Sequence, residues 1–453
     1  MENIRIKNLI EACEKHPEIQ LIDMVIMQDD QVIFDWTKPP YQKDTKHLLF
    51  SVTKSFTSLA IGILCDQGKI TVDDLVSDYF KEETKDLDKP TVKELKIKHL
   101  LMMGSGIQSG LSFRNFLSGN WVRLFFNQEF PYKPGSYFAY CSLTSHMLSE
   151  IVTKVTGMTL EAFLKEHLFN NLNITDYSWE HYEGKTVGGV GLSLKTSDMM
   201  KVGKMLLHDG NYEGTQIISK TYLDQATKPQ ILKQNVIESD FTPHAGKAYG
   251  YQFHVSPRSY RADGAFGQLI MVFKKEKIVV VATSQNTHYE AFYTAIDQNL
   301  NLKPIKSDIS SKKLNEYLTT LTYQKQDFKR ITSARDFGNY LVASNELKIK
   351  EVNLIKGILT FTYEDGRENE FDVFKNGGKY GKSLFLKDYK IEELKHYIEV
   401  TWEKDKLHMR LFYIETPYVV DYTLDFKPTK VALEFKVNVS FFYDGFKVIG
   451  AKI

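Results

Sequence analysis

The sequence is poor in cysteine and has no long apolar segment. Its cysteines among 453 residues are Cys13, Cys65 and Cys141. Because they are odd in number, scattered and without metal-ligand spacing, they predict neither a disulfide framework nor a zinc site, and a reducing compartment is expected. No apolar run is long enough to span a bilayer, and residues 1–20 alternate charged with apolar side chains instead of forming the apolar core of a secretory signal. These absences predict a cytoplasmic protein without a membrane span.

An excess of charge of either sign is also lacking. The chain has 58 Lys and Arg residues against 57 Asp and Glu residues, so nothing predicts a nucleic acid or an anionic membrane as a partner. The 12 histidines include no His-Glu-x-x-His motif, and no Gly-x-Ser-x-Gly motif marks a nucleophile elbow. The sequence therefore indicates no metal and no cofactor, although a Ser-His-Asp triad assembled from distant residues stays open.

Aromatic residues, in contrast, are abundant. With 25 Tyr and 29 Phe the chain can fill large cores, and its length predicts two or three domains. A helix and a hairpin are expected first, followed by mainly helical periodicity over residues 70–235. Strands are then expected at 248–255, 267–275 and 277–285. Strands at both ends of this region predict one antiparallel sheet with helices, which is an α+β architecture.

The pattern changes after a lysine-rich connector at about residues 302–314. Beyond about residue 335, apolar and polar residues alternate with a period of two. This alternation predicts about eight antiparallel strands that close into a small barrel or sandwich. The expected organisation is a first domain at 1–304, a linker with a short helix at 305–334 and an all-β domain at 335–453.

A serine followed three residues later by a lysine opens a strongly apolar helix in the segment LLFSVTKSFTSLAIGILCDQGK, residues 48–69. Residues three apart lie on one helix face, so the Lys54 amine can reach the Ser51 hydroxyl. A lysine buried near a helix N-terminus is disfavoured in its charged form and can act as a base near neutral pH. The same pattern also fits a Ser51 helix cap followed by a solvated Lys54. The Ser-x-x-Lys spacing alone leaves both interpretations open.

Four further stretches follow this helix in a characteristic order. They are IKHLLMMGSGI, YKPGSYFAYCSLTSHMLSEIV, GGVGLSLKTSDMMKVGKMLLHDGNYEG and ADGAFGQLIMVFKKEKIVVVATSQN. Together they resemble the serine β-lactamase and penicillin-binding-protein superfamily, in the branch of class C β-lactamases, esterases and D-aminopeptidases. The similarity covers about residues 1–300. It implies a β-lactamase-like domain of antiparallel sheet and helices, and the segment after 335 resembles the lipocalin-like barrel of some members.

The resemblance implies catalytic roles for three side chains. Ser51 would be the acylating nucleophile, Lys54 its proton acceptor, and Tyr140 the tyrosine that exchanges protons with the nucleophile and the leaving group. The backbone N–H groups of Ser51 and Ala265 would form the oxyanion hole. From its residue type alone, Tyr140 would be interpreted as a core aromatic.

Two expected substrate-binding positions depart from the superfamily pattern. Ser142 replaces the asparagine that binds the substrate amide. Ala262, Asp263 and Gly264 replace the Lys-Thr-Gly strand, so the usual cation for a substrate carboxylate is missing. Arg261 is adjacent, but strand alternation directs it to the other face unless a bulge intervenes. Both departures argue against β-lactam hydrolysis.

The sequence as a whole predicts a serine hydrolase that cleaves a small ester, amide or peptide through an acyl-enzyme on Ser51. It is expected to be more like an esterase or D-peptidase than a true β-lactamase. The alternative is a catalytically silent penicillin-binding-like module that binds a ligand or a partner. The sequence leaves open whether the barrel binds a ligand or only shields the first domain, and whether the chain forms a homo-oligomer.

Overall fold

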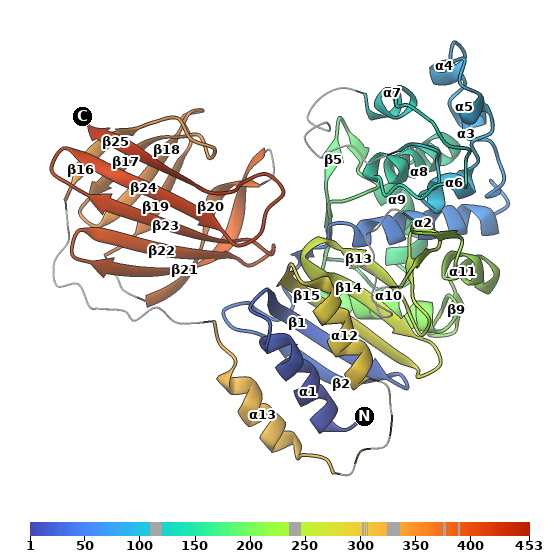
Figure 1. Cartoon of the computed structure of the whole chain (residues 1–453), viewed down its shortest axis with the longest axis horizontal. Helices are drawn as coiled ribbons and strands as arrows, with labels where there is room; N and C mark the ends of the chain where they lie inside the picture. Colours follow the sequence, from blue (N-terminus) through green and yellow to red (C-terminus); the bar gives the residue numbers. More distant parts are fainter. Residues whose placement is uncertain are drawn as a thin grey trace. The chain divides into compact units, whose positions relative to one another are not determined.

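The computed structural model shows two compact units, which Figure 1 displays in sequence colours. The described residues are 1–108, 120–234, 246–300, 303, 305, 307–323, 336–374, 377–387 and 390–453. One unit consists of Met1–Thr37 and Lys46–Leu318, and the other of Lys38–Thr45 and Thr319–Ile453. Part of the predicted linker, at residues 306 and 324–334, lies outside the described residues.

An eight-stranded antiparallel sheet forms the centre of the first unit. Its strand order is β10-β11-β12-β13-β14-β15-β1-β2, so the N-terminal hairpin pairs with β15. The predicted α+β architecture, with both ends of the region in one antiparallel sheet, is confirmed. The strands are β1 (Ile19–Gln28), β2 (Gln31–Thr37), β10 (Ile231–Leu232), β11 (Ala248–Tyr249), β12 (His254–Val255), β13 (Tyr260–Gly264), β14 (Gln268–Phe273) and β15 (Ile278–Asn286).

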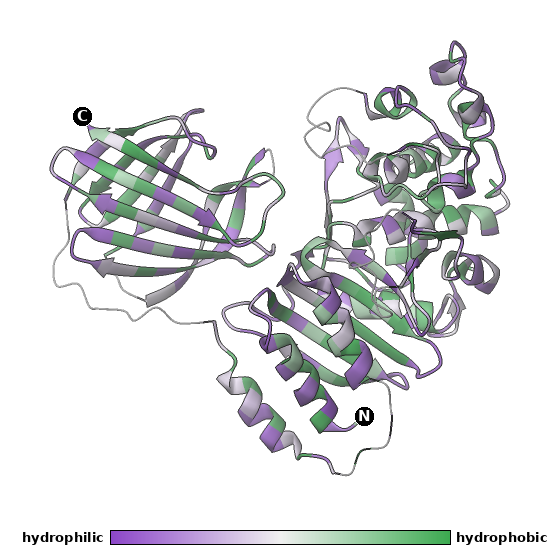
Figure 2. Cartoon of the chain, in the orientation of Figure 1, coloured by the Kyte–Doolittle hydropathy of each residue, from purple (hydrophilic) through white to green (hydrophobic). Residues whose placement is uncertain are grey.

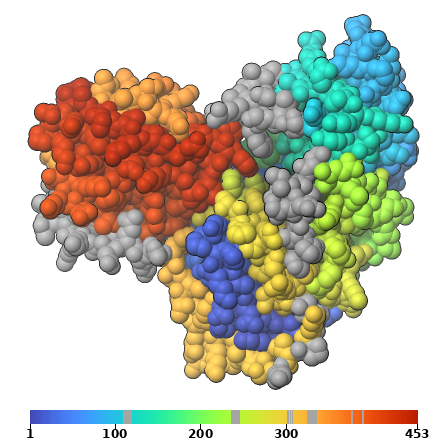
Figure 3. Space-filling view, in the orientation of Figure 1, coloured from blue at the N-terminus to red at the C-terminus, as the bar shows by residue number. Residues whose placement is uncertain are grey.

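Helices cover both faces of this sheet. On one face, α1 (Asn3–Glu14) and α12 (Tyr289–Asn299) lie side by side, as the space-filling view also shows (Figure 3). On the other face, α10 (Thr196–Leu207) packs against β1, β14 and β15. Because both faces are covered, β14 and β15 are buried along their whole length and consist mainly of apolar residues.

A buried helix, α2 (Val52–Asp66), lies in the helical region of the same unit. Every residue from Val52 to Leu64 is buried, because α2 contacts α8, α9, α11, β13 and β14 around its circumference. The other elements are α3 (Val76–Tyr79), α4 (Lys81–Thr84), α5 (Pro90–Lys93), α6 (Ile97–Leu101), α7 (Trp121–Phe126), α8 (Ser142–Thr156), α9 (Leu160–Leu164), the π-helix η2 (Lys165–Phe169), α11 (Lys220–Ala226), the 3₁₀ turn η4 (Ala265–Gly267), α13 (Ser311–Thr320), β3 (His47–Leu48), β4 (Ser178–Trp179), β5 (His181–Tyr182), β6 (Lys185–Thr186), β7 (Leu192–Leu194), β8 (Asn211–Tyr212) and β9 (Thr215–Gln216).

The second unit is a nearly closed antiparallel barrel. Its strand order is β19-β18-β17-β16-β25-β24-β23-β22-β21-β20, and the end strands β19 and β20 also contact each other. The predicted C-terminal barrel is confirmed, with ten strands where about eight were expected. They are β16 (Gly338–Val342), β17 (Ile349–Ile355), β18 (Ile358–Tyr363), β19 (Glu368–Asp372), β20 (Gly377–Lys387), β21 (Lys390–Glu403), β22 (Lys406–Tyr413), β23 (Val419–Phe426), β24 (Lys430–Val437) and β25 (Phe446–Lys452).

Period-two burial fills the barrel interior with apolar and aromatic side chains. In β23, the buried residues Tyr422, Leu424 and Phe426 alternate with half-buried polar ones. Figure 2 shows the same alternation of hydrophobic and hydrophilic residues along the barrel strands. The rings of Tyr422 and Phe435, from neighbouring strands, lie 5.3 Å apart. The barrel therefore has a packed aromatic core.

A short segment from the N-terminal part of the sequence completes the second unit. Residues Lys38–Thr45, between β2 and β3, belong to it. The Tyr41 ring packs 6.2 Å from the ring of Phe412, and the Tyr380 hydroxyl donates to the carbonyl of Pro40 at 2.6 Å. The first domain expected from the sequence, residues 1–304, includes this segment.

Candidate active site

Ser51 and Lys54 are in direct contact at the start of α2. The Lys54 amine donates to the Ser51 hydroxyl at 2.9 Å. The Ser51 side chain makes no helix-capping hydrogen bond, and Lys54 is only 1% exposed. The sequence left two interpretations open. The structure agrees with a buried lysine beside the serine and excludes a helix cap followed by a solvated lysine.

Burial changes the acidity of Lys54. Loss of hydration lowers the pKa of its ammonium group from its ordinary value of 10.5 to about 7. The amine also donates to the hydroxyl of Ser142 at 3.0 Å and to the carbonyl of Gly189 at 2.6 Å. A large fraction of this lysine is therefore neutral near pH 7, and the neutral amine can accept a proton from the serine it touches.

Tyr140 lies beside Ser51 and Lys54. The Lys54 amine is 5.0 Å from the centre of its ring. Loss of hydration raises the pKa of the phenol well above its ordinary value, although the Ser51 side chain is near enough to its hydroxyl to lower that pKa in part, so Tyr140 is protonated at neutral pH. The residue keeps 37% of its surface exposed, unlike a core aromatic. Ser51, Lys54 and Tyr140 therefore lie together where solvent can reach them.

The four residues expected to bind substrate occupy different positions around this group. Ser142 begins α8 and contacts the Lys54 amine. Ala262 is buried, and a side chain at Gly264 would lie 2.2 Å from the carbonyl of Leu49, so β13 approaches the chain just before Ser51 closely. Asp263 is hydrogen-bonded to the side chains of Arg261 and Tyr293.

Arg261 is engaged by contacts with neighbouring side chains. Its Nε donates to Asp263 at 2.9 Å, and its guanidinium lies 4.1 Å from the centre of the Tyr293 ring. The Tyr293 hydroxyl also donates to Asp263, at 2.5 Å. The register between β13 and β14 is regular, so no bulge turns Arg261 toward Ala262. Arg258 is likewise engaged, with Glu276 and Asp297 at 2.9 and 2.7 Å.

Sequence reasoning missed a half-buried lysine near Tyr140. The Lys233 amine lies 3.0 Å from His254 Nδ1, and the His254 ring lies 6.1 Å from the Tyr140 ring. Burial lowers the pKa of Lys233 to about 7 and that of His254 well below its ordinary value. Neither residue belongs to a recognisable motif, since their proximity arises only from the pairing of β10, β11 and β12. The carbonyl of Gly189 was also missed as a partner of Lys54.

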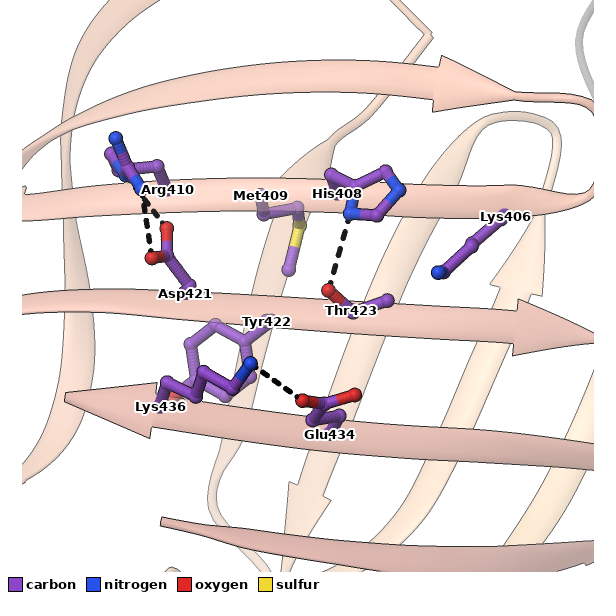
Figure 4. A pocket seen from close by; sticks show the side chains of 9 residues that line it. All are labelled: Lys406, His408, Met409, Arg410, Asp421, Tyr422, Thr423, Glu434 and Lys436. Atoms are coloured by element: carbon purple, nitrogen blue, oxygen red, sulfur yellow. Dashed lines mark hydrogen bonds and ion pairs between the residues drawn. The ribbon is translucent and has the colours of Figure 1, made fainter. Parts of the chain in front are cut away.

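A hollow of about 320 Å³ lies elsewhere, on the polar face of barrel strands β22, β23 and β24 (Figure 4). Four of its charged side chains form pairs, one across two strands and one along a strand. Arg410 donates to both carboxylate oxygens of Asp421 at 2.7 and 2.9 Å, and Lys436 pairs with Glu434 at 2.9 Å. Such pairs are typical of a solvated sheet surface. Among the described residues, no three His, Cys, Asp or Glu side chains cluster as a metal site would require.

Comparison with known families identifies the first unit. The beta-lactamase family model matches residues 6–302, about two thirds of the chain. The chain belongs to the beta-lactamase family. This membership confirms the resemblance inferred from the ordered motifs.

Curated members of the beta-lactamase family match only in part. Protein flp of Staphylococcus aureus (strain MW2) is 27% identical over 149 residues, which cover 31% of this chain and 30% of that protein. The 6-aminohexanoate-dimer hydrolase of Paenarthrobacter ureafaciens is 23% identical over 216 residues, which cover 44% of this chain and 55% of that enzyme. The matched segment thus spans about a third to a half of these relatives.

Solved structures of the family share the fold at low identity. The octameric penicillin-binding protein homologue from Pyrococcus abyssi has a TM-score of 0.50 and 18% identity, and the match covers 98% of both chains. A family VIII carboxylesterase has a TM-score of 0.52 and 15% identity, covering 65% of this chain and 97% of the esterase. Other proteins that share the fold include EstCE1, named as a hydrolase with promiscuous acyltransferase activity. Among the described residues, no helix is long and apolar enough to cross a membrane.

Proposed function

We propose that the protein is a serine hydrolase that cleaves an ester or an amide through an acyl-enzyme on Ser51. The observation that carries this proposal is the 2.9 Å contact between the Ser51 hydroxyl and the Lys54 amine, whose pKa burial lowers to about 7. A serine hydroxyl is a weak nucleophile until a neighbouring base takes its proton. Lys54 is that base, and the carbonyl of Gly189 and the hydroxyl of Ser142 orient its amine.

In acylation, Ser51 Oγ bonds to the substrate carbonyl carbon while its proton passes to Lys54. The carbonyl oxygen becomes negatively charged, and the N–H groups of Ser51 and Ala265 stabilise it. Within the described part of the chain, neither N–H donates to a protein acceptor, so both are available to a substrate oxygen. When the tetrahedral intermediate collapses, the bond to the leaving group breaks and Tyr140 supplies the proton that the leaving group needs.

In deacylation, water replaces the leaving group. The Tyr140–Lys54 pair removes a proton from the water as its oxygen bonds to the acyl carbon, and the same two N–H groups stabilise the second oxyanion. Collapse releases the acid, and the proton returns to Ser51 Oγ. Lys54 and Tyr140 thus end in their starting states, and the cycle consumes one water per bond cleaved.

We further propose neutral esters or amides as the preferred substrates, with esterase-like or D-peptidase-like rather than β-lactamase activity. Support comes from Ala262 at the position of the expected lysine and from the contacts that hold Arg261 and Arg258. A carboxylate-bearing substrate would lose the charge-assisted contact that a lysine at position 262 provides in the superfamily. The known relatives named as carboxylesterase and as 6-aminohexanoate-dimer hydrolase agree with an ester or amide bond as the target.

Covalent labelling tests the proposal. A fluorophosphonate probe should form an adduct that peptide mapping assigns to Ser51, and Ser51→Ala should abolish it. A hydrolysis screen over esters, D-amino-acid amides and β-lactams then identifies the substrate class. If folded wild-type protein stays unlabelled at high probe excess and cleaves none of these substrates, the catalytically silent binding module becomes the better account.

A further inference from the structure

Two phenylalanines with left-handed backbones flank the proposed oxyanion donors. Phe50, directly before Ser51, has φ of 47°, and Phe266, directly after Ala265, has φ of 61°. L-residues with a bulky side chain disfavour this region, and they remain there only when their surroundings hold them. Each of the two donors is therefore next to a phenylalanine whose backbone conformation is unfavourable without tertiary contacts.

The side chains of these two phenylalanines pack against each other. Their ring centroids are 5.3 Å apart with an interplanar angle of 85°, and both residues are buried. This edge-to-face arrangement is a favourable geometry for aromatic pairs. A second contact lies on the other side of Ala265, where Gly264 approaches the carbonyl of Leu49 so closely that a side chain would not fit. The segment just before Ser51 therefore meets the other segment on both sides of Ala265.

Hydrogen bonds fix the turn that contains Phe266. The Phe266 N–H donates to the Tyr289 hydroxyl at 2.7 Å, and the Ser284 hydroxyl donates to the Phe266 carbonyl at 2.9 Å. The Gln268 side-chain amide donates to the carbonyl of Ala265 at 3.2 Å. Side chains from α12, β15 and β14 thus hold this turn in place. Through its contact with Phe50, the Phe266 ring also restrains the segment before Ser51.

We propose that Phe50 and Phe266 form a brace that fixes the relative placement of the Ser51 and Ala265 N–H groups. They are positioning residues, since they act through the two backbone donors. The catalytic effect of the brace rests on the proposed function. The packing of the two chain segments against each other does not. Donors aimed in advance at the oxyanion stabilise the transition state, so loosening them lowers kcat more than it changes KM.

Hydrogen exchange tests the brace without any turnover. We expect Phe50→Leu to accelerate amide exchange at least about twofold in the peptide covering residues 262–268, and Phe266→Leu to do the same for residues 47–56. Leucine keeps much of the buried volume, so both variants should fold. The matched control is the Phe80–Phe126 pair, another buried edge-to-face pair with centroids 5.6 Å apart. Its leucine variants should leave both peptides unchanged.

A double-mutant cycle in kcat tests the catalytic consequence. Each single leucine variant should lower kcat roughly tenfold on a nitrophenyl ester with KM within about twofold, a smaller loss than removal of a whole oxyanion donor. The double variant should be hardly slower than the worse single variant, because one contact can be lost only once. Phe80→Leu and Phe126→Leu should keep the wild-type kcat.

The outcomes separate the brace from the proposed function. Unchanged exchange in the opposite peptide, or additive losses in kcat, would show that the two rings act independently and would overturn the brace. If the variants instead raise only KM, and do so more for longer acyl chains, the two rings line the substrate pocket. Failure of wild-type protein to label at Ser51 would remove the proposed function, and the exchange experiment would still decide whether the brace exists.

Discussion

The two units of this protein each place a serine beside a nitrogen base, and they differ in what else surrounds that pair. In the barrel, the Ser383 hydroxyl lies 3.0 Å from His396 Nδ1 and 3.3 Å from the Tyr413 hydroxyl. In the first unit, Ser51 has Lys54 and Tyr140 as partners. By residue types alone, the serine–histidine pair would be the more familiar catalytic arrangement.

Access and free backbone donors distinguish the two serines. Ser383 and His396 are each 4% exposed and lie on adjacent strands, whose N–H groups belong to the sheet. Ser51 is half-buried at a helix start, next to an N–H that has no acceptor within the described part of the chain. A serine at the end of an element can therefore offer both its hydroxyl and a donor to one substrate carbonyl, whereas a serine within a strand cannot. The Ser383 group reads as a satisfied polar cluster of the barrel core.

Removing the two bases should produce the largest contrast between the units. Lys54→Ala should lower kcat roughly a thousandfold or more, because the proton of Ser51 then has no acceptor. His396→Gln should leave kcat within about twofold and affect only the stability of the barrel. Initial rates with nitrophenyl acetate measure both. Comparable losses in the two variants would mean that the barrel cluster takes part in the chemistry.

Removing the hydroxyl of Tyr140 or of Tyr413 should have the next largest effect. Tyr140→Phe should lower kcat roughly a hundredfold, the usual size of a lost general acid–base step. Its melting temperature should hardly change, because Tyr140 is partly exposed and loses only its hydroxyl. Tyr413→Phe, which removes a buried hydroxyl bonded to Ser383, should show the reverse pattern. An unchanged rate for Tyr140→Phe would assign Tyr140 to packing.

The two units should respond to pH in different ranges. Because Lys54 must be neutral to accept a proton, kcat/KM should rise with pH toward a plateau with an apparent pKa near 7, and it should be about tenfold lower at pH 6. The unfolded chain binds more protons at Lys54 between pH 7 and 10.5, so this residue makes folding more favourable as pH rises through that window.

In the barrel, burial lowers the pKa of His396 from 6.5 to about 4. The unfolded chain therefore binds more protons at His396 between these two values, and barrel stability should fall as pH decreases from 6.5 toward 4. Thermal unfolding followed at several pH values measures this loss, and His396→Gln should flatten it. A rate profile without an inflection near pH 7 would contradict the assignment of Lys54 as the base.

Substrate charge should produce an effect of about tenfold. We expect kcat/KM for a small neutral nitrophenyl ester to exceed that for nitrocefin at least about ten times, because one missing charge-assisted hydrogen bond costs about 1.5–3 kcal/mol. Arg261→Ala should affect the two substrates alike, since Arg261 is engaged with Asp263 and Tyr293. Efficient β-lactam turnover that disappears in this variant would instead make Arg261 the substitute for the missing lysine.

Removal of the barrel should have the smallest effect on chemistry. A chain ending at residue 320 keeps α13, whose neighbour Ile309 accepts a hydrogen bond from Asn3 of α1. Because Ser51, Lys54, Tyr140 and Ala265 all belong to the first unit, fluorophosphonate labelling should stay within about threefold of the full-length rate. Solubility should fall, since Lys38–Thr45 loses the partners that cover Tyr41. An unfolded product would show that the units share one core.

The architecture could be predicted well where local patterns repeat. Period-two alternation predicted the barrel, and the motif order predicted the first unit, whereas the strand count was too low because short strands such as β19 carry a weak signal. Membership of Lys38–Thr45 in the second unit could not be predicted, since its partner Phe412 lies far away in the sequence. Hydrophobic patterns specify which face is buried, but they do not specify the partner that buries it.

The same division applies to the candidate site. The sequence by itself determined that Ser51 and Lys54 share a helix face, because helical periodicity is a local property. Only the tertiary structure decided that Lys54 is buried, with Ser142 and the Gly189 carbonyl, 88 and 135 residues away, as its hydrogen-bond partners. It also decided that Phe50 meets Phe266. The pKa of a lysine and the placement of two backbone donors depend on desolvation and packing by segments distant in sequence, and these forces exist only once the chain has folded.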